Sequence, residues 1–172
     1  GSLKIYQTLP WNHRCWGVGS GKKGSYNATH IQFEICEDGL TDKNYFNKVY
    51  KEACEITAYL CDMYNIDPNG TVTVNGVKVP TILCHADSFK LGLGSNHGDI
   101  NHWFPKHGKS MQTARDDVQA LLNNKDTTPP KENESKELFQ RNDAIGSVRC
   151  LTFSNEYLGT EHSIDRCSHR RI

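Results

Sequence analysis

The sequence predicts an α/β fold in which a central mixed sheet is flanked by helices. Strands are predicted at residues 30–36 and 81–84 and amphipathic helices at 41–65 and 110–122, so the two kinds of element alternate along the chain. Hydrophobic residues make up 36% of the 172 residues, which is polar for a globular protein but sufficient for one core.

Two segments alternate apolar and polar residues with the period of a strand. Residues 3–8 (LKIYQT) form the first of them. Residues 30–36 (HIQFEIC) place three apolar side chains on one face and four others, Glu34 among them, on the opposite face. A carboxylate in the middle of a strand indicates that this face is either open to solvent or the floor of a site.

The longest helical pattern spans residues 41–65, where apolar residues recur at steps of three and four. Thr41 is its predicted N-cap. An Asn-Gly pair at 75–76 predicts a tight hairpin turn between strands at 71–74 and 77–79. The helix and the hairpin should both cover the sheet.

The next part of the chain combines a strand with a histidine-rich segment. The strand at 81–84 ends at His85, and a loop rich in glycine and histidine is expected from there to about His107. A second amphipathic helix, 110–122, follows this loop.

The length favours one domain, which we place at residues 1–123. Residues 124–137 are polar and contain two prolines, which predicts an extended linker. Residues 138–172 are weakly patterned with a basic end, and we assign this tail no role.

Charge and cysteine usage exclude several classes of protein. The formal net charge is zero, so nucleic acid and anionic membrane are not expected as partners. No apolar run could span a bilayer, and no signal peptide opens the chain. The seven cysteines are odd in number and include no CxxC pair, which favours buried thiols in a protein made in a reducing cytoplasm over a disulfide framework.

Candidate chemistry concentrates between residues 84 and 105. His85 directly follows a strand, and Asp99 lies beyond a glycine-punctuated loop that can fold back. Imidazole and carboxylate together suit Zn²⁺, and Glu34 is the natural acceptor for a proton from the attacking water. The alternative is that His85 has a purely structural role and that His102 and His107 are surface residues.

Three stretches carry a resemblance to a known family: THIQFEICED (29–38), CHADSFKLGLGSNHGDINHWFPKHGKSM (84–111) and IYQTLPWNHRCWGVGSG (5–21). They resemble the amidase-2 family of N-acetylmuramoyl-L-alanine amidases, which includes phage endolysins and peptidoglycan recognition proteins. The resemblance spans roughly residues 3 to 122. It implies zinc-dependent hydrolysis of the amide between N-acetylmuramic acid and L-alanine in peptidoglycan.

The resemblance also implies residue roles. His85 and Asp99 match zinc ligands, Glu34 matches the carboxylate that orients or deprotonates water, and His97 sits where several members have a lysine that steadies the oxyanion. Trp16 lies in a loop that borders the substrate groove. The complete set of substrate-binding candidates is Trp16, His30, Asn96 and Trp103.

The chain departs from the family pattern in one respect. The family's first zinc histidine lies on a strand upstream of the segment equivalent to residues 3–8, and no residue here matches it. The sequence therefore reads as N-terminally incomplete or as a degenerate paralogue. The alternative function is a non-catalytic peptidoglycan-binding domain of the same fold, inactive through loss of a zinc ligand.

The resemblance also gives an expectation for where and how the protein acts. Like a prophage endolysin, it would be made in the cytoplasm without a signal peptide and would degrade the cell wall after release. Peptidoglycan is the expected partner, and a monomer is the expected state.

Overall fold

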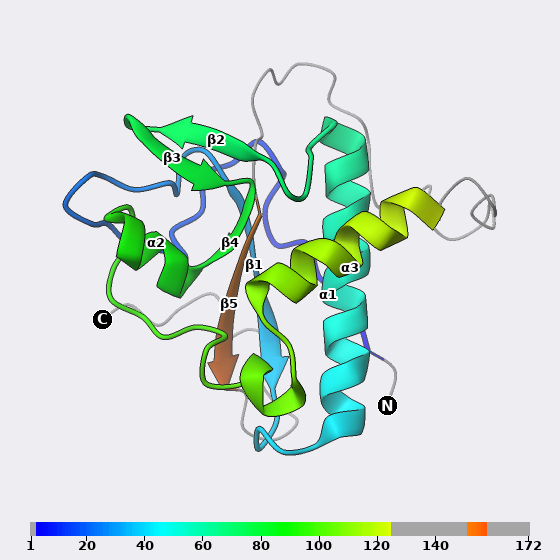
Figure 1. The fold of residues 1–172 in the computed structure, drawn as a ribbon. Helices are drawn as coiled ribbons and strands as arrows, with labels where there is room; N and C mark the ends of the chain where they lie inside the picture. The colour runs from blue at the N-terminus through cyan, green and yellow to red at the C-terminus, as the bar shows by residue number, and fades with distance from the viewer. Residues whose placement is uncertain (1–2, 125–150, 158–172) are drawn as a thin grey trace.

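The computed structural model describes residues 3–124 and 151–157 of the chain. Within these residues, strands β1 (Ile31–Glu37), β5 (Leu151–Tyr157) and β4 (Ile82–Cys84) form a three-stranded sheet in the order β1-β5-β4. Strands β2 (Thr71–Val74) and β3 (Val77–Pro80) form a separate antiparallel hairpin (Figure 1). The predicted α/β class is confirmed, with the parallel and antiparallel strands in two sheets.

Strand β5 occupies the centre of the parallel sheet. It pairs with β1, where Ile31 lies opposite Leu151 and Glu37 opposite Tyr157. It also pairs in parallel with β4, where Ile82 lies opposite Leu151. Strands β1 and β4 are therefore joined through β5, about 10 Å apart at two strand spacings.

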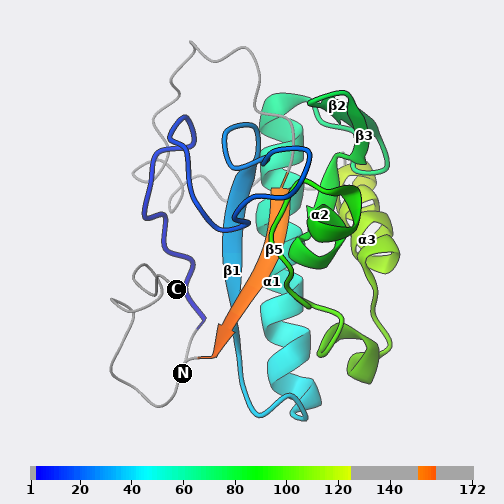
Figure 2. The ribbon, with the colours of Figure 1, turned by 90° about the vertical axis from the view of Figure 1, so that its left-hand side faces the viewer.

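Helix α1 (Lys43–Tyr64) packs against this sheet and supplies more of the main core than any other element (Figure 2). The Asp42 carboxylate accepts hydrogen bonds from the backbone N–H groups of Asn44 and Tyr45, so Asp42 rather than Thr41 is the N-cap. Asn65 ends the helix in the left-handed conformation, with φ of 52°. The predicted helix is confirmed within two residues at each end.

Helix α3 (Met111–Asn123) crosses α1, and a polar cluster joins the two (Figure 1). The Tyr50 hydroxyl donates to the Asp117 carboxylate at 2.6 Å, and Lys109 pairs with the same carboxylate oxygen at 2.7 Å. Burial acts to raise the pKa of the Asp117 carboxyl, but the bonds from Lys109 and Tyr50 outweigh it and hold this pKa below its usual value.

A second, smaller core lies beneath the β2-β3 hairpin. It joins the hairpin to strand β4 and to the long loop before β1, and its buried members are Val18, Tyr26, Val74, Val79, Leu83 and Leu93. The Tyr26 hydroxyl donates to the Cys84 carbonyl oxygen at 3.3 Å. This core therefore fixes the loop of residues 15–30 against the end of β4.

Two expectations from the sequence are wrong. Residues 3–8 form no strand, and their apolar side chains Leu3, Ile5 and Tyr6 are 37%, 51% and 54% exposed, so the alternating pattern has no buried face. The segment after His85 is not a continuous loop. Its first part is helix α2 (His85–Leu91), and a 3₁₀ turn (Phe104–His107) follows later.

The remaining predictions about the fold are either confirmed or fall outside the described residues. The hairpin at the Asn-Gly pair, strand β4 and helix α3 are confirmed. The cysteines in the described part of the chain are all free thiols. The predicted linker lies outside the described residues except for Asn124, and of the predicted tail only β5 is described. None of the described helices is both long and apolar enough to cross a membrane.

Candidate metal centre

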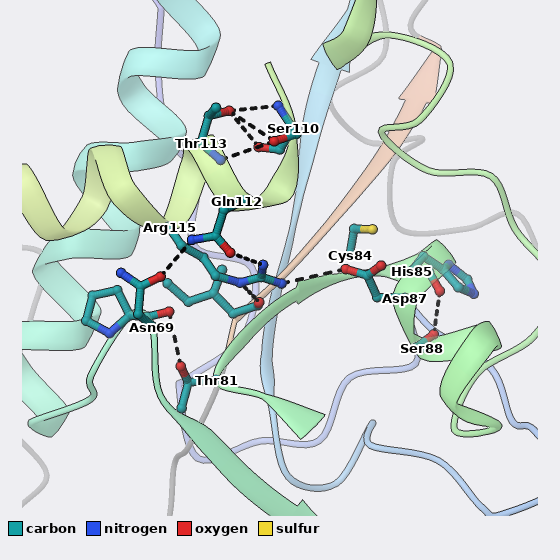
Figure 3. Close-up of polar contacts among 12 residues, drawn as sticks. Asn69, Thr81, Cys84, His85, Asp87, Ser88, Ser110, Gln112, Thr113 and Arg115 are labelled. Carbon is teal, nitrogen blue, oxygen red and sulfur yellow. Dashed lines mark hydrogen bonds and ion pairs between the residues drawn. The ribbon is translucent and has the colours of Figure 1, made fainter. Parts of the chain in front are cut away.

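His85 lies at the junction of strand β4 and helix α2, where two elements hold its backbone. The Ser88 hydroxyl donates to the His85 carbonyl oxygen at 2.6 Å (Figure 3). Arg115 of α3 donates to the Ile82 carbonyl oxygen at 2.8 Å and pairs with Asp87 at 3.8 Å. The junction is thus fastened to α3, and His85 is held on a rigid part of the fold.

The loop after α2 turns back to bring Asp99 beside His85. Gly92 ends the helix with φ of 80°, a conformation that glycine adopts without strain. Ile100, next to Asp99, has φ of 57°, which is uncommon for a β-branched residue and is maintained here by full burial of its side chain. Asp99 itself is only 2% exposed.

Two imidazoles face the Asp99 carboxylate. The Nδ1 atom of His97 lies 2.6 Å from one carboxylate oxygen, and the Nδ1 atom of His85 lies 3.4 Å from the other. The two rings stack with centroids 4.9 Å apart. The His85 side chain is buried, whereas that of His97 is 54% exposed.

One ligand atom from each of His85, His97 and Asp99 lies within 4.8 Å of the others, so this group could hold a metal ion. Within the described residues no lysine or arginine pairs with Asp99, so its buried charge faces only the two histidines. A buried carboxylate is stable only with a compensating charge or hydrogen bonds. Two nitrogens and one oxygen form a donor set that suits Zn²⁺, so the residues present fit this ion.

Glu34 is outside this group and lies on strand β1. Ile31 and Ile35 belong to the core on the α1 side, so Glu34 points to the opposite side, where it is exposed. Glu34 lies opposite Ser154 in the register, and Cys84 lies opposite the preceding residue of β5. Glu34 therefore lies near the level of Cys84, the residue before His85, and two strand spacings of about 10 Å separate β1 from β4 across β5.

The four substrate-binding candidates divide into two pairs. Trp16 is 71% exposed, with the Arg14 guanidinium 4.0 Å from its ring centroid, and Asn96 is exposed beside His97. Trp103 is fully buried against Phe46, and we do not carry its substrate-binding assignment forward, because a core residue offers no surface to a ligand.

His30 is also buried, at 5% exposure, with its ring centroid 4.4 Å from that of Tyr26. Its Nδ1 atom lies 2.6 Å from the Thr29 hydroxyl, and its Nε2 atom is buried without a hydrogen-bond partner. Burial lowers the pKa of His30 to about 3, so the ring is neutral at neutral pH. We do not carry its substrate-binding assignment forward either.

Sequence reasoning missed Ser95, whose hydroxyl lies 3.0 Å from Nε2 of His85. A serine in a glycine-rich loop carries no pattern that distinguishes it from any turn residue. Its spacing of ten residues from His85 becomes informative only once Gly92 has reversed the chain.

The chain also matches a known protein family. A family model described as N-acetylmuramoyl-L-alanine amidase matches residues 2–107, a segment that includes strands β1 and β4 and all three residues of the candidate metal group. Comparisons with curated proteins and with solved structures give no significant match. Since the match covers more than half of the chain, and the sequence stretches that resemble these amidases lie within or overlap it, the protein belongs to the N-acetylmuramoyl-L-alanine amidase (Amidase_2) family.

Proposed function

We propose that this protein hydrolyses the amide bond between N-acetylmuramic acid and L-alanine in peptidoglycan, with a zinc ion held by His85 and Asp99. Membership of the amidase family supports action on peptidoglycan in general. The observation that carries the zinc proposal is the convergence of three ligand atoms within 4.8 Å beside a buried carboxylate. An endolysin-like role, lysing the wall after release from the cytoplasm, is part of the proposal.

When bound, zinc lowers the pKa of a coordinated water to about 7 and polarises a carbonyl oxygen. Glu34 accepts a proton from the attacking water as the oxygen bonds to the lactyl carbonyl carbon. The same proton then passes to the nitrogen of L-alanine as the C–N bond breaks. The products are a carboxylate on the sugar and a peptide with a free amine.

His97 adjoins both the metal group and the solvent. Its Nδ1 atom faces Asp99, while the side chain is 54% exposed and accessible to a bound substrate. We assign His97 the role of stabilising the oxyanion of the transition state. The same geometry would let it act as a third zinc ligand, and the metal content of a His97 variant distinguishes the two roles.

Trp16 and Asn96 contact the substrate in this proposal. An exposed indole offers a flat apolar surface to a sugar ring or peptide, and the Asn96 amide can both donate and accept hydrogen bonds. Asn96 precedes His97 in the chain, and Trp16 lies in the loop whose Val18 carbonyl oxygen accepts hydrogen bonds from Ser95.

The test is a Glu34→Gln variant, loaded with zinc and assayed on purified muropeptides. Loss of the general base should slow release of the free L-alanine amine by roughly 10²–10⁴-fold while zinc content stays at the wild-type level. The matched control is Glu55→Gln, which removes a carboxylate paired with Lys51 on the surface of α1. Wild-type turnover in Glu34→Gln would exclude the assigned role.

The non-catalytic alternative gives a different result in the same assay. If the protein is only a binding domain, the wild-type chain should bind to peptidoglycan but release no amine, whether or not zinc is supplied. Retention together with amine release supports the enzyme.

A further inference from the structure

Ser95 occupies a position between the candidate metal group and the loop of residues 15–18. Its hydroxyl oxygen lies 3.0 Å from Nε2 of His85 and 3.3 Å from the Val18 carbonyl oxygen, to which it donates. Its backbone N–H donates to the same carbonyl at 2.9 Å. Two hydrogen bonds to Val18 therefore fix Ser95, and its hydroxyl contacts the ring nitrogen of His85 that points away from Asp99.

The proton inventory of these groups constrains His85. A serine hydroxyl has one proton to donate and lone pairs with which to accept, whereas a carbonyl can only accept. When the hydroxyl donates to Val18, its contact with His85 requires a proton on Nε2. The Nδ1 atom of His85 then carries a lone pair directed at Asp99, 3.4 Å away.

This arrangement is the one that a cation needs. A metal between Nδ1 of His85 and the Asp99 carboxylate requires Nδ1 to be unprotonated, so the ring proton must lie on Nε2 and find an acceptor. With Val18 receiving the serine proton, the Ser95 oxygen is that acceptor. If the ring proton were on Nδ1, the serine would have to turn from Val18 to donate to Nε2.

We propose that Ser95 is a positioning residue that selects Nδ1 of His85 as the metal donor by accepting the Nε2 proton. This inference rests on the proposed function, since it assumes that His85 binds the metal. Outer partners of ligating histidines fix the tautomer and the ring orientation. Ser95 acts only through His85 and touches neither metal nor substrate.

The experiment measures zinc affinity by competition with a chromogenic chelator, with zinc alone as the probe. In Ser95→Ala the Kd for zinc should rise about tenfold, the lower end of the range for such partners, because Ser95 is exposed enough for water to replace part of its contact. The matched control is Ser110→Ala, which removes the N-cap of α3. It should lower thermal stability and leave the zinc Kd unchanged.

Nitrogen-15 NMR of the imidazoles gives a second readout that needs no variant. In the zinc-loaded wild-type chain, the proton of His85 should be found on Nε2. A proton on Nδ1, or a wild-type zinc Kd in a folded Ser95→Ala, overturns the inference and leaves the metal site standing. Failure of the wild-type chain to bind zinc would overturn the proposed metal site and this inference together.

Discussion

His85 and His30 are equally buried, at 5% exposure each, yet their surroundings differ in kind. His85 follows β4 and faces a buried carboxylate through one nitrogen and a serine through the other. His30 precedes β1, and its side chain hydrogen-bonds only to the Thr29 hydroxyl and packs against the Tyr26 ring, while its second ring nitrogen has no hydrogen-bond partner. Because burial is the same for both, the opposing carboxylate is what makes His85 a candidate ligand.

The surroundings of His30 also determine how this histidine responds to acid. Around His85 the carboxylate offers a cation a place to bind. Around His30 desolvation lowers the pKa to about 3, so the folded protein resists charging the ring. The same type of side chain is therefore a candidate ion ligand after β4 and a source of acid sensitivity before β1.

Removing the carboxylate should have the largest effect, because it makes the surroundings of His85 resemble those of His30. Asp99→Asn keeps the shape of the side chain and removes its charge, so we expect zinc binding and amidase turnover to fall below detection. Elemental analysis after dialysis measures the metal.

The matched control is Asp117→Asn, which removes a carboxylate that only joins α1 to α3. It should lower the melting temperature and leave zinc bound. Stoichiometric zinc in Asp99→Asn would show that the carboxylate is not a ligand.

A change at His97 should have a smaller effect and sharpen the description of the His85 site. If His97 steadies the oxyanion, His97→Ala slows turnover by roughly 10²–10³-fold, the range for loss of one such donor, while zinc remains. Metal content and turnover are measured on the same sample. Loss of zinc from this variant would instead identify His97 as a third ligand.

The smallest effect concerns His30 and is seen only as a pH dependence of stability. Its pKa is lowered in the folded state, so the unfolded chain binds more protons between pH 6.5 and about 3, and stability falls as the pH falls through this window. Each unit of pH below 6.5 should cost about 1.4 kcal/mol. Urea unfolding at pH 7 and pH 5 measures the loss.

The variant His30→Gln should flatten this dependence, because glutamine does not titrate. The exposed His13 provides the control, and His13→Gln should keep the wild-type slope. An unchanged slope in His30→Gln would show that other groups govern the acid sensitivity.

Local patterns predicted helices α1 and α3 and the hairpin well. The apolar face of α1 and the Asn-Gly turn each depend on residues that are close together in the sequence. Such local features can be predicted without knowledge of the tertiary structure. The strand predicted at residues 3–8 is absent, because an alternating segment forms a strand only where another strand is available to pair with it. Helix α2 was missed although Asp87 near its start, Lys90 near its end and Gly92 beyond it were visible signals.

The site was predictable in composition but not in geometry. His85 and Asp99 could be selected from residue type and family resemblance. The two side chains come close together because Gly92 and Ile100 adopt positive φ values, and no periodic pattern in the sequence predicts these conformations. The exposed and buried members of the substrate-binding candidates could not be separated either, because Trp16 and Trp103 differ only in tertiary packing.

The central place of β5 has a consequence for how the protein reaches its native state. Strands β1 and β4 both come well before β5 in the sequence, and in the sheet each of them pairs with β5 rather than with the other. Closing a sheet through contacts so distant along the chain is slow compared with forming a helix or hairpin. We therefore expect α1 and the β2-β3 hairpin to form early and the alignment of β1 with β4 to arise last, during a period when unpaired strand edges are open to aggregation.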